Sequence, residues 1–195
     1  MKLNLPNKLT IFRIIMAPVC MLFIMLTVMP DLWARVISAA IFIVTAATDM
    51  LDGMIARKYN LITDLGKFLD PIADKLLIIG TMLALIIRNG MTFGDTLFVN
   101  VMIWVLFIVI ARELAVTSLR MIAAASEEKV VIAASWPGKL KTVTQTAGVL
   151  VMILEPIIIP GSYYLVSYIM LGLITLATVI SGVMYFNSYK KFLIK

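Results

Sequence analysis

Residues 49–74 read DMLDGMIARKYNLITDLGKFLDPIAD and lie between two strongly apolar segments of the chain. Four of its carboxylates stand in two closely spaced pairs, one toward each end of the stretch: Asp49, Asp52, Asp70 and Asp74. A carboxylate at membrane depth costs roughly 3 kcal/mol unless a charged partner compensates it, so four acids close together require cations. Their hard oxygen atoms suit Mg²⁺ or Mn²⁺. The stretch therefore predicts a divalent-metal site for which all four acids supply ligands, and two acid pairs on facing helices can hold one or two ions.

The spacing of this stretch also predicts two functional helix faces. At about 100° per residue of an α-helix, five residues share the first face: Asp49, Asp52, Gly53, Ala56 and Arg57. The second face, by the same measure, carries Gly66, Asp70 and Asp74. The glycine and alanine of the first face let a bulky ligand approach the backbone, and the guanidinium of Arg57 matches the geometry of phosphate. Interfacial charges at helix ends would explain any one of these residues, whereas the whole set in phase predicts a diphosphate site.

The composition is that of a polytopic membrane protein. Of the 195 residues 62% are hydrophobic, and the mean hydropathy is +1.04, which no soluble domain of this size requires. Six apolar segments are predicted to be transmembrane helices: residues 9–28, 32–56, 68–87, 96–125, 140–158 and 164–185. We expect one all-α bundle that forms a single membrane domain over residues 1–195. Since the chain has no histidine, acid–base chemistry falls to a carboxylate, a lysine or a tyrosine.

The positions of the basic residues predict the orientation of the bundle. The chain has 17 Lys and Arg residues. Six spans would place Arg35 and Arg88 on one side of the membrane and all the others on the side of the two termini. The positive-inside rule then puts both termini and the Asp-rich stretch at the cytoplasmic side of the cell membrane. The net charge of +6 is thus explained by topology and by contact with anionic lipid headgroups, so no nucleic acid is expected as a partner.

A second group of cations predicts another anionic ligand. Arg112 lies inside a long apolar segment, where a charge needs a partner, and Arg120 follows eight residues later on roughly the same face. Lys139 and Lys141 open the next predicted helix. Glu113 should point about 100° away from Arg112 and is therefore not expected to neutralise it. These cations suggest a phosphate-bearing second substrate, with simple anchoring of the helix end at the membrane surface as the alternative for the two lysines.

The pattern D-x2-D-G-x2-A-R-x8-G-x3-D-x3-D resembles the signature of the CDP-alcohol phosphotransferase family, and this chain matches every fixed position. The resemblance implies a membrane enzyme of six transmembrane helices, forming a homodimer, that transfers a substituted phosphate from a CDP-linked donor to an alcohol and releases CMP. Three flanking segments look like those of the bacterial phosphatidylglycerophosphate synthase branch: PNKLTIFR at 6–13, ARELAVTSLR at 111–120 and PGKLKTVTQ at 137–145. That branch implies CDP-diacylglycerol as donor and glycerol 3-phosphate as acceptor.

Roles for individual residues follow from the pattern and the resemblance together. The donor would be bound by nine residues: Asp49, Asp52, Gly53, Ala56, Arg57, Gly66, Asn7, Thr10 and Arg13. Packing or capping is an open alternative for the last three. The acceptor phosphate would meet Arg112, Lys139, Lys141 and Arg120. Asp70 and Asp74 are the expected catalytic residues beside two Mg²⁺ or Mn²⁺ ions. Because histidine is absent, Asp74 is predicted to be the general base, with metal ligation alone as its alternative role.

Several other functions remain open from the sequence. Within the family, the acceptor could instead be inositol phosphate, serine, or phosphatidylglycerol as in cardiolipin synthesis. An intramembrane prenyltransferase also binds diphosphate through Asp-rich helices, but would require more helices and a longer chain. A divalent-cation transporter would need acids along a path through the membrane, whereas these acids gather at one side. A structural membrane protein would show no dependence on magnesium.

Overall fold

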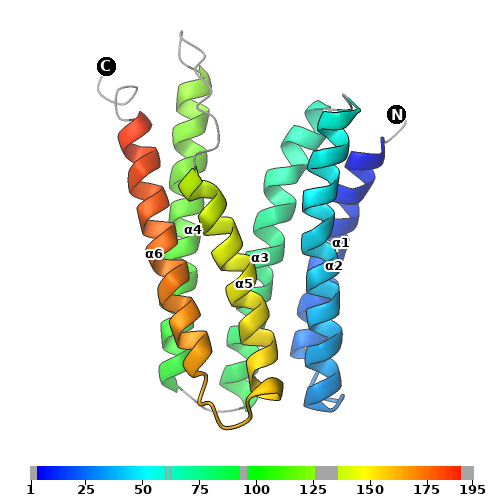
Figure 1. Cartoon of the computed structure of the whole chain (residues 1–195), viewed down its shortest axis with the longest axis vertical. Helices are drawn as coiled ribbons and strands as arrows, with labels where there is room; N and C mark the ends of the chain where they lie inside the picture. Colours follow the sequence, from blue (N-terminus) through cyan, green and yellow to red (C-terminus); the bar gives the residue numbers. More distant parts are fainter. Residues whose placement is uncertain (1–3, 60, 62, 93–95, 126–135, 190–195) are drawn as a thin grey trace.

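The computed structural model of the chain describes residues 4–59, 61, 63–92, 96–125 and 136–189. These residues form an all-α structure whose helices have the following bounds: α1 Leu5–Met25, α2 Asp31–Lys58, α3 Asp64–Thr92, α4 Thr96–Ala125, α5 Trp136–Ile158 and α6 Leu165–Tyr189. Figure 1 shows the helices side by side, each running opposite to the one before it in the chain. The all-helical fold expected from the composition is confirmed for this part of the chain.

The helix bounds differ from the predicted ones chiefly where polar residues continue a helix. α4 has the predicted bounds, whereas α1 begins at Leu5, because the side chain of Asn4 caps it by accepting a hydrogen bond from the backbone N–H of Asn7 at 3.1 Å. α3 extends at both ends beyond the predicted 68–87. Gly66 and Arg88, which lie just outside the predicted segment, are therefore helical. The loop predicted at 126–139 lies outside the described residues as far as 135, and residues 136–139 form the first turn of α5 instead.

The six helices form two groups of three. In Figure 1, α1, α2 and α3 pack together on one side of the molecule, and α4, α5 and α6 on the other. The start of α1, the link from α2 to α3, and the end of α6 lie at the same end of the bundle. Because the Asp-rich stretch spans the link from α2 to α3, it shares this end with both chain termini of the helical bundle. We call this the signature end.

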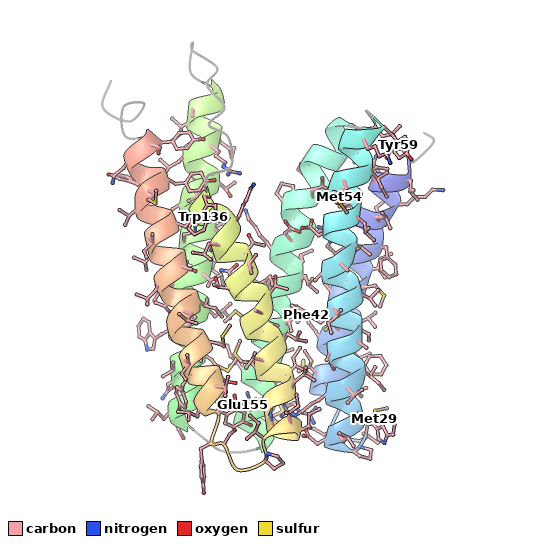
Figure 2. All side chains as sticks on the ribbon, in the orientation of Figure 1. Met29, Phe42, Met54, Tyr59, Trp136 and Glu155 are labelled. Atoms are coloured by element: carbon pink, nitrogen blue, oxygen red, sulfur yellow. The ribbon has the colours of Figure 1, made fainter. Side chains whose placement is uncertain are left out.

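The interior of the bundle joins the two groups. One buried apolar cluster takes residues from every helix, among them Ala17, Phe42, Met82, Phe98, Met152 and Leu171. Phe42 of α2, which is fully buried, is labelled in Figure 2. The outer surface carries many large apolar side chains, while Arg13 and Arg35 are buried. This distribution of apolar and charged side chains is the reverse of that in a soluble protein. It suits a protein in a bilayer, whose charged groups face the interior of the helix bundle.

Five helices of the described chain are long and apolar enough to cross a membrane, namely α1, α2, α4, α5 and α6. The multiple apolar helices identify a membrane protein. α3 is not among the five. The prediction that residues 68–87 form a further span therefore stays a prediction.

A charged cluster closes the end of the bundle opposite to the signature end. Asp31 at the start of α2 accepts hydrogen bonds from Arg35 Nε at 2.9 Å and from Arg88 Nη2 of α3. The second arm of each guanidinium binds a backbone carbonyl: Arg88 Nη1 donates to Ile24 of α1, and Arg35 Nη1 to Ile153 of α5 at 3.2 Å. We call Asp31, Arg35 and Arg88 the Asp31 cluster; it ties four helices together.

Candidate functional site

The guanidinium of Arg13 lies among the predicted metal ligands at the signature end. The Arg13 side chain is fully buried. Its Nη1 donates to Asp49 Oδ1 at 2.6 Å and to Asp74 Oδ1 at 2.5 Å, and its Nη2 donates to Asp52 Oδ2. These charge-assisted hydrogen bonds join α1, α2 and α3. Sequence reasoning placed Arg13 in the donor pocket, whereas the structure places its guanidinium on the carboxylates.

Thr10 brings the fourth carboxylate into the same group. Its buried hydroxyl lies 2.7 Å from Asp70 Oδ1, 3.5 Å from Asp52 Oδ2 and 3.1 Å from the carbonyl oxygen of Pro6. A hydroxyl has a single proton to donate, and the shortest contact assigns it to Asp70. One turn of α1, from Thr10 to Arg13, therefore contacts all four acids. We call Asp49, Asp52, Asp70 and Asp74 the carboxylate cluster.

The carboxylate cluster has the chemistry of a hard-cation site. In the arrangement seen here, Arg13 lies between three of the acids. Within the described residues, no three acidic, cysteine or histidine side chains are close enough together to hold a metal ion. Three of the carboxylates nevertheless bind one buried guanidinium, and the fourth, Asp70, binds the neighbouring Thr10 hydroxyl. Asp52 is buried, while the side chains of Asp49 and Asp74 are 39% and 50% exposed. Carboxylate oxygens are the ligands that Mg²⁺ and Mn²⁺ prefer, so the donor set fits these ions.

A pocket of about 240 Å³ opens beside the carboxylate cluster. Its lining includes most of the predicted donor-binding residues: Asn7, Thr10, Asp52, Gly53, Ala56 and Gly66. Asp70 also lines it, together with Pro6, Leu61 and Thr63, which sequence reasoning did not select. Arg57 is part of α2 by its backbone, and its side chain lies outside the described structure. The small residues at 53 and 56 thus form part of a pocket wall, as the helical spacing predicted.

The wall of this pocket is held by a contact between the start of α1 and the start of α3. Thr63 Oγ1 accepts a hydrogen bond from the backbone N–H of Gly66 at 3.0 Å and donates to Asn7 Oδ1 at 2.9 Å. A Cβ atom at Gly66 would lie 2.9 Å from Asn7 Oδ1. Gly66 is therefore required for this close approach. Thr63 could have been selected from the sequence, because it lies three residues before Gly66 at the start of α3. Threonine commonly caps a helix at such a position.

The second cationic group is organised by Glu113, contrary to the prediction. Glu113 Oε1 accepts hydrogen bonds from Arg112 Nη1 at 2.8 Å and from Lys141 Nζ of α5. Neighbouring side chains on a helix leave the backbone about 100° apart, but long flexible chains can bend round to meet where water is scarce. Arg112 also donates from Nη2 to Ser181 Oγ of α6 at 2.6 Å. The three helices of the second group thus meet at Glu113 and Arg112.

Arg120 extends this cationic group through an aromatic ring. Arg120 Nη2 donates to the Tyr185 hydroxyl at 2.8 Å. The guanidinium carbons of Arg112 and Arg120 lie 5.4 Å and 5.1 Å from the centre of the Tyr185 ring, within the range of cation–π attraction. Lys139 is exposed near the start of α5. The structure therefore brings Arg112, Arg120 and Lys141 together and leaves Lys139 at the surface; sequence reasoning missed Tyr185.

The carboxylate cluster and the cationic group face each other across the two halves of the bundle. Asp74 of α3 and Lys141 of α5 are close enough to interact electrostatically. One residue after Asp74, Lys75 Nζ donates to Thr117 Oγ1 of α4 at 2.7 Å. A metal-type acid cluster, a pocket with small residues in its wall and a set of phosphate-type cations therefore meet in one region.

Comparison with known proteins agrees with this geometry. The family model described as CDP-alcohol phosphatidyltransferase matches residues 3–184. The chain is 36% identical to the CDP-diacylglycerol–glycerol-3-phosphate 3-phosphatidyltransferase of Bacillus subtilis strain 168, over 94% of both chains. It is 36% identical to a probable phosphatidylglycerophosphate synthase of Mycobacterium tuberculosis (93% of this chain, 79% of that protein), and 33% identical to the CDP-diacylglycerol–glycerol-3-phosphate 3-phosphatidyltransferase of Yersinia pestis (96% of each). On this agreement of site, pattern and relatives, the chain belongs to the CDP-alcohol phosphatidyltransferase family.

Proposed function

We propose that this protein transfers the phosphatidyl group of CDP-diacylglycerol to glycerol 3-phosphate, which yields phosphatidylglycerophosphate and releases CMP. The observation that carries the proposal is the electrostatic interaction of Asp74 in the carboxylate cluster with Lys141, which shares Glu113 with Arg112, near a pocket with small residues in its wall. A donor diphosphate can bind at the carboxylate cluster only if metal cations are bound there. An acceptor that carries its own phosphate needs further cationic side chains next to that cluster. The relatives named above carry this reaction in their names.

The donor would lie with its CMP part in the pocket between the starts of α1, α2 and α3. Asp49, Asp52, Asp70 and Asp74 would hold Mg²⁺ or Mn²⁺, as two ions. When bound, such ions polarise a phosphoryl group and neutralise the charge of the departing phosphate. Arg13 and Thr10 orient the acids from α1.

The acceptor would approach from the side of α4, α5 and α6. Its phosphate would meet Arg112, Lys141 and Arg120, with Lys139 at the entrance. Arg112 Nε is buried without a hydrogen-bond partner in the described structure, which leaves this guanidinium with an unused donor. The free hydroxyl attacks the phosphorus linked to diacylglycerol, the bond from that phosphorus to CMP breaks, and the hydroxyl proton passes to a carboxylate oxygen of Asp74. Asp74 suits this role because its side chain is half exposed and it interacts electrostatically with Lys141.

An acceptor panel tests this proposal. Purified protein receives labelled CDP-diacylglycerol, Mg²⁺ and one acceptor: glycerol 3-phosphate, glycerol, inositol phosphate, serine or phosphatidylglycerol. CMP release with a phosphatidylglycerophosphate product is expected for glycerol 3-phosphate alone. A preference for another acceptor would change the assigned acceptor but not the type of reaction. No CMP release with any acceptor would contradict the proposal as a whole.

Variants of the cationic group sharpen the acceptor test. Arg112→Ala removes a charge-assisted hydrogen bond of about 1.5–3 kcal/mol, so kcat/KM for glycerol 3-phosphate should fall roughly tenfold to a hundredfold. Lys139→Ala should have a smaller effect, because Lys139 is exposed. The KM for CDP-diacylglycerol should change little. Arg112→Lys should restore part of the activity, because an ammonium lacks the planar fork. Equal losses with glycerol and glycerol 3-phosphate would mean that these residues support the fold.

For the membrane arrangement, we propose six spans, with α3 as the sixth, and the signature end at the cytoplasmic face of the cell membrane. We further propose that residues 1–195 act as one domain and that the chain forms a homodimer. In a Cys20→Ser background, a cysteine at Ser188 near the end of α6 should react with an impermeant reagent only from the cytoplasmic side. A cysteine at Tyr163, which is 88% exposed between α5 and α6, should react only from outside. The reverse pattern would contradict this orientation.

A further inference from the structure

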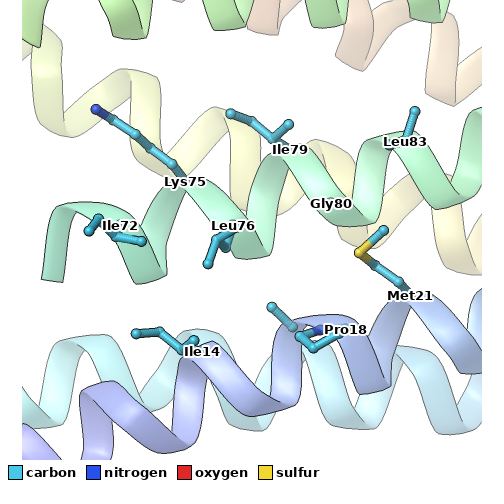
Figure 3. Close-up of a pocket in the computed structure, with 10 residues that line it drawn as sticks. Ile14, Pro18, Met21, Ile72, Lys75, Leu76, Ile79, Gly80 and Leu83 are labelled. Atoms are coloured by element: carbon cyan, nitrogen blue, oxygen red, sulfur yellow. The ribbon is translucent and has the colours of Figure 1, made fainter. Parts of the chain in front are cut away.

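An apolar cavity of about 530 Å³ lies between α1 and α3, outside the region where the two charged groups meet. Figure 3 shows it in close-up. The residues that define it come from one stripe on each helix: Ile14, Pro18 and Met21 of α1, and Leu76, Gly80 and Leu83 of α3. In Figure 3, Leu76 and Met21 each point toward the opposite helix. We call this cavity the α1–α3 groove.

The α1–α3 groove begins at the carboxylate cluster. Ile14 directly follows Arg13 in the chain, and Lys75, which also lines the groove, directly follows Asp74. α1 and α3 run in the same direction away from the signature end (Figure 1). From Lys75 to Leu83 the helix rises about 12 Å. The groove therefore leads from the reacting end of the proposed site toward the middle of the bundle.

The groove is open to the outside of the bundle and carries a positive charge at its head. Leu76 and Leu83 are 45% and 42% exposed, so a molecule in the surrounding bilayer can reach them. The ammonium of Lys75 lies at the end nearest the carboxylate cluster, and the other lining residues are uncharged. An anionic headgroup beside Lys75 with an apolar chain extending toward Leu83 matches this arrangement in both charge and polarity.

We infer that the α1–α3 groove holds one acyl chain of the lipid-linked donor, an inference that rests on the proposed function. Hydrocarbon chains of the bilayer are as apolar as leucine, so the groove gains no hydrophobic driving force by taking one up. Its effect is to orient the donor. A chain held along α1 and α3 limits where the attached phosphate can lie, and that position is beside Asp74.

Met21 divides the groove into a near part and a far part. A Cβ atom at Gly80 would lie 2.7 Å from Met21 Sδ, so the methionine packs directly on this glycine. Figure 3 shows the Met21 side chain directed at Gly80. Methionine is flexible and adapts to its neighbours, so a long chain can displace it and continue to Leu83. A short chain ends before it, and the groove should therefore distinguish donors by chain length.

Tryptophan substitutions at both parts of the groove test this inference. Leu83→Trp blocks the far part and Leu76→Trp the near part; Leu22→Trp is the matched control, since Leu22 of α1 is 58% exposed and does not line the groove. CMP release is measured with CDP-dipalmitoylglycerol and CDP-dihexanoylglycerol in the same detergent. Leu83→Trp should lower kcat/KM for the long-chain donor about tenfold or more and for the short-chain donor less than about twofold. Leu22→Trp should change neither, and Leu76→Trp should impair the long-chain donor at least as strongly.

The outcomes separate this inference from the proposed function. Equal losses for both donors, or no loss for either, would overturn the groove as a chain site while the wild type still releases CMP. No CMP release by the wild type with either donor would overturn the proposed function, and the inference with it. If the variants fail to fold, a donor with a photoreactive acyl chain is added to the wild type; adducts on residues 14–21 or 72–83 are expected, and adducts only elsewhere would overturn the inference. In a Cys20→Ser background, efficient disulfide formation between two Leu76→Cys chains in membranes would instead assign the groove to a second copy.

Discussion

The carboxylate cluster and the Asp31 cluster stand at opposite ends of the same three helices and have opposite charge balances. At the signature end, Arg13 alone binds three acids, and two of those acids are substantially exposed. At the other end, Asp31 accepts hydrogen bonds from two guanidinium groups, each of which also donates from Nη1 to a backbone carbonyl. The Asp31 cluster is thus a structural contact between helices with no excess of negative charge. The carboxylate cluster has excess negative charge and exposed carboxylates that an added cation can reach. The charge balance of a buried network, more than its hydrogen bonding, therefore distinguishes a binding site from a structural contact between helices.

The largest expected effect is loss of catalysis from the carboxylate cluster. Asp70→Asn and Asp74→Asn each remove one charge with little change in shape, so the protein should stay folded in detergent while CMP release is abolished. Turnover and the elution profile on size exclusion are measured together. A variant that keeps more than about a tenth of wild-type turnover, which means about 1.4 kcal/mol or less of barrier, would lose its assigned role.

Chelation should have an equally complete but reversible effect. EDTA should stop CMP release, and Mg²⁺ or Mn²⁺ added in excess should restore it, because the excess acids require divalent cations to bind a diphosphate. The melting temperature gives a second measurement, since a bound ion stabilises the folded state by mass action. Full activity in chelator would remove the metal from the mechanism.

Breaking the Asp31 cluster should instead reduce stability. Asp31→Ala leaves the buried guanidinium groups of Arg35 and Arg88 without their carboxylate, which costs up to 3–5 kcal/mol at a fully buried site. Because the Asp31 side chain is 40% exposed, we expect about 2 kcal/mol. The melting temperature in detergent should fall by several degrees, while CMP release well below it is retained. Asp31→Ala combined with Arg88→Met should recover part of the loss; a collapse of kcat without a change in melting temperature would contradict the contrast between the two clusters.

Arg13→Lys should have an intermediate effect that tests how the acids are oriented. Lysine keeps the positive charge, but its single ammonium cannot reproduce the two-armed contact with Asp49, Asp52 and Asp74. We expect kcat to fall about tenfold with the fold intact. Unchanged kcat would show that the charge of Arg13 suffices and that its geometry does not position the carboxylates.

The smallest expected effect is at Gly66. In Gly66→Ala, the new Cβ would lie 2.9 Å from Asn7 Oδ1, so the Asn7 side chain, which lines the donor pocket, must move. The KM for the donor should rise a few-fold, with kcat little changed. Gly90→Ala on the same helix is the control, because no atom lies within 4 Å of its Cβ position. Equal donor KM values in the two variants would contradict a role for the contact between Gly66 and Asn7.

Periodicity along single helices made part of this site predictable. Since an α-helix turns by about 100° per residue, the spacing of Asp49 and Asp52 already placed them on one face with Gly53. The same reasoning placed Asp70 and Asp74 together. Apolar length predicted the six helical segments, and α4 came out with the predicted bounds. These features depend only on neighbours within about one or two turns, so the sequence by itself determined them.

Contacts between helices were decided only by the tertiary structure. Nothing in the spacing of α1 indicates that Arg13 reaches three acids on α2 and α3, or that Thr10 selects Asp70. Glu113 shows the same limit, because its partner Lys141 is 28 residues away on another helix. A long charged side chain can reach many positions around its own backbone. Which position it takes depends on the acceptor that packing brings within hydrogen-bond distance in a site with little water, and that acceptor is set by how the helices meet.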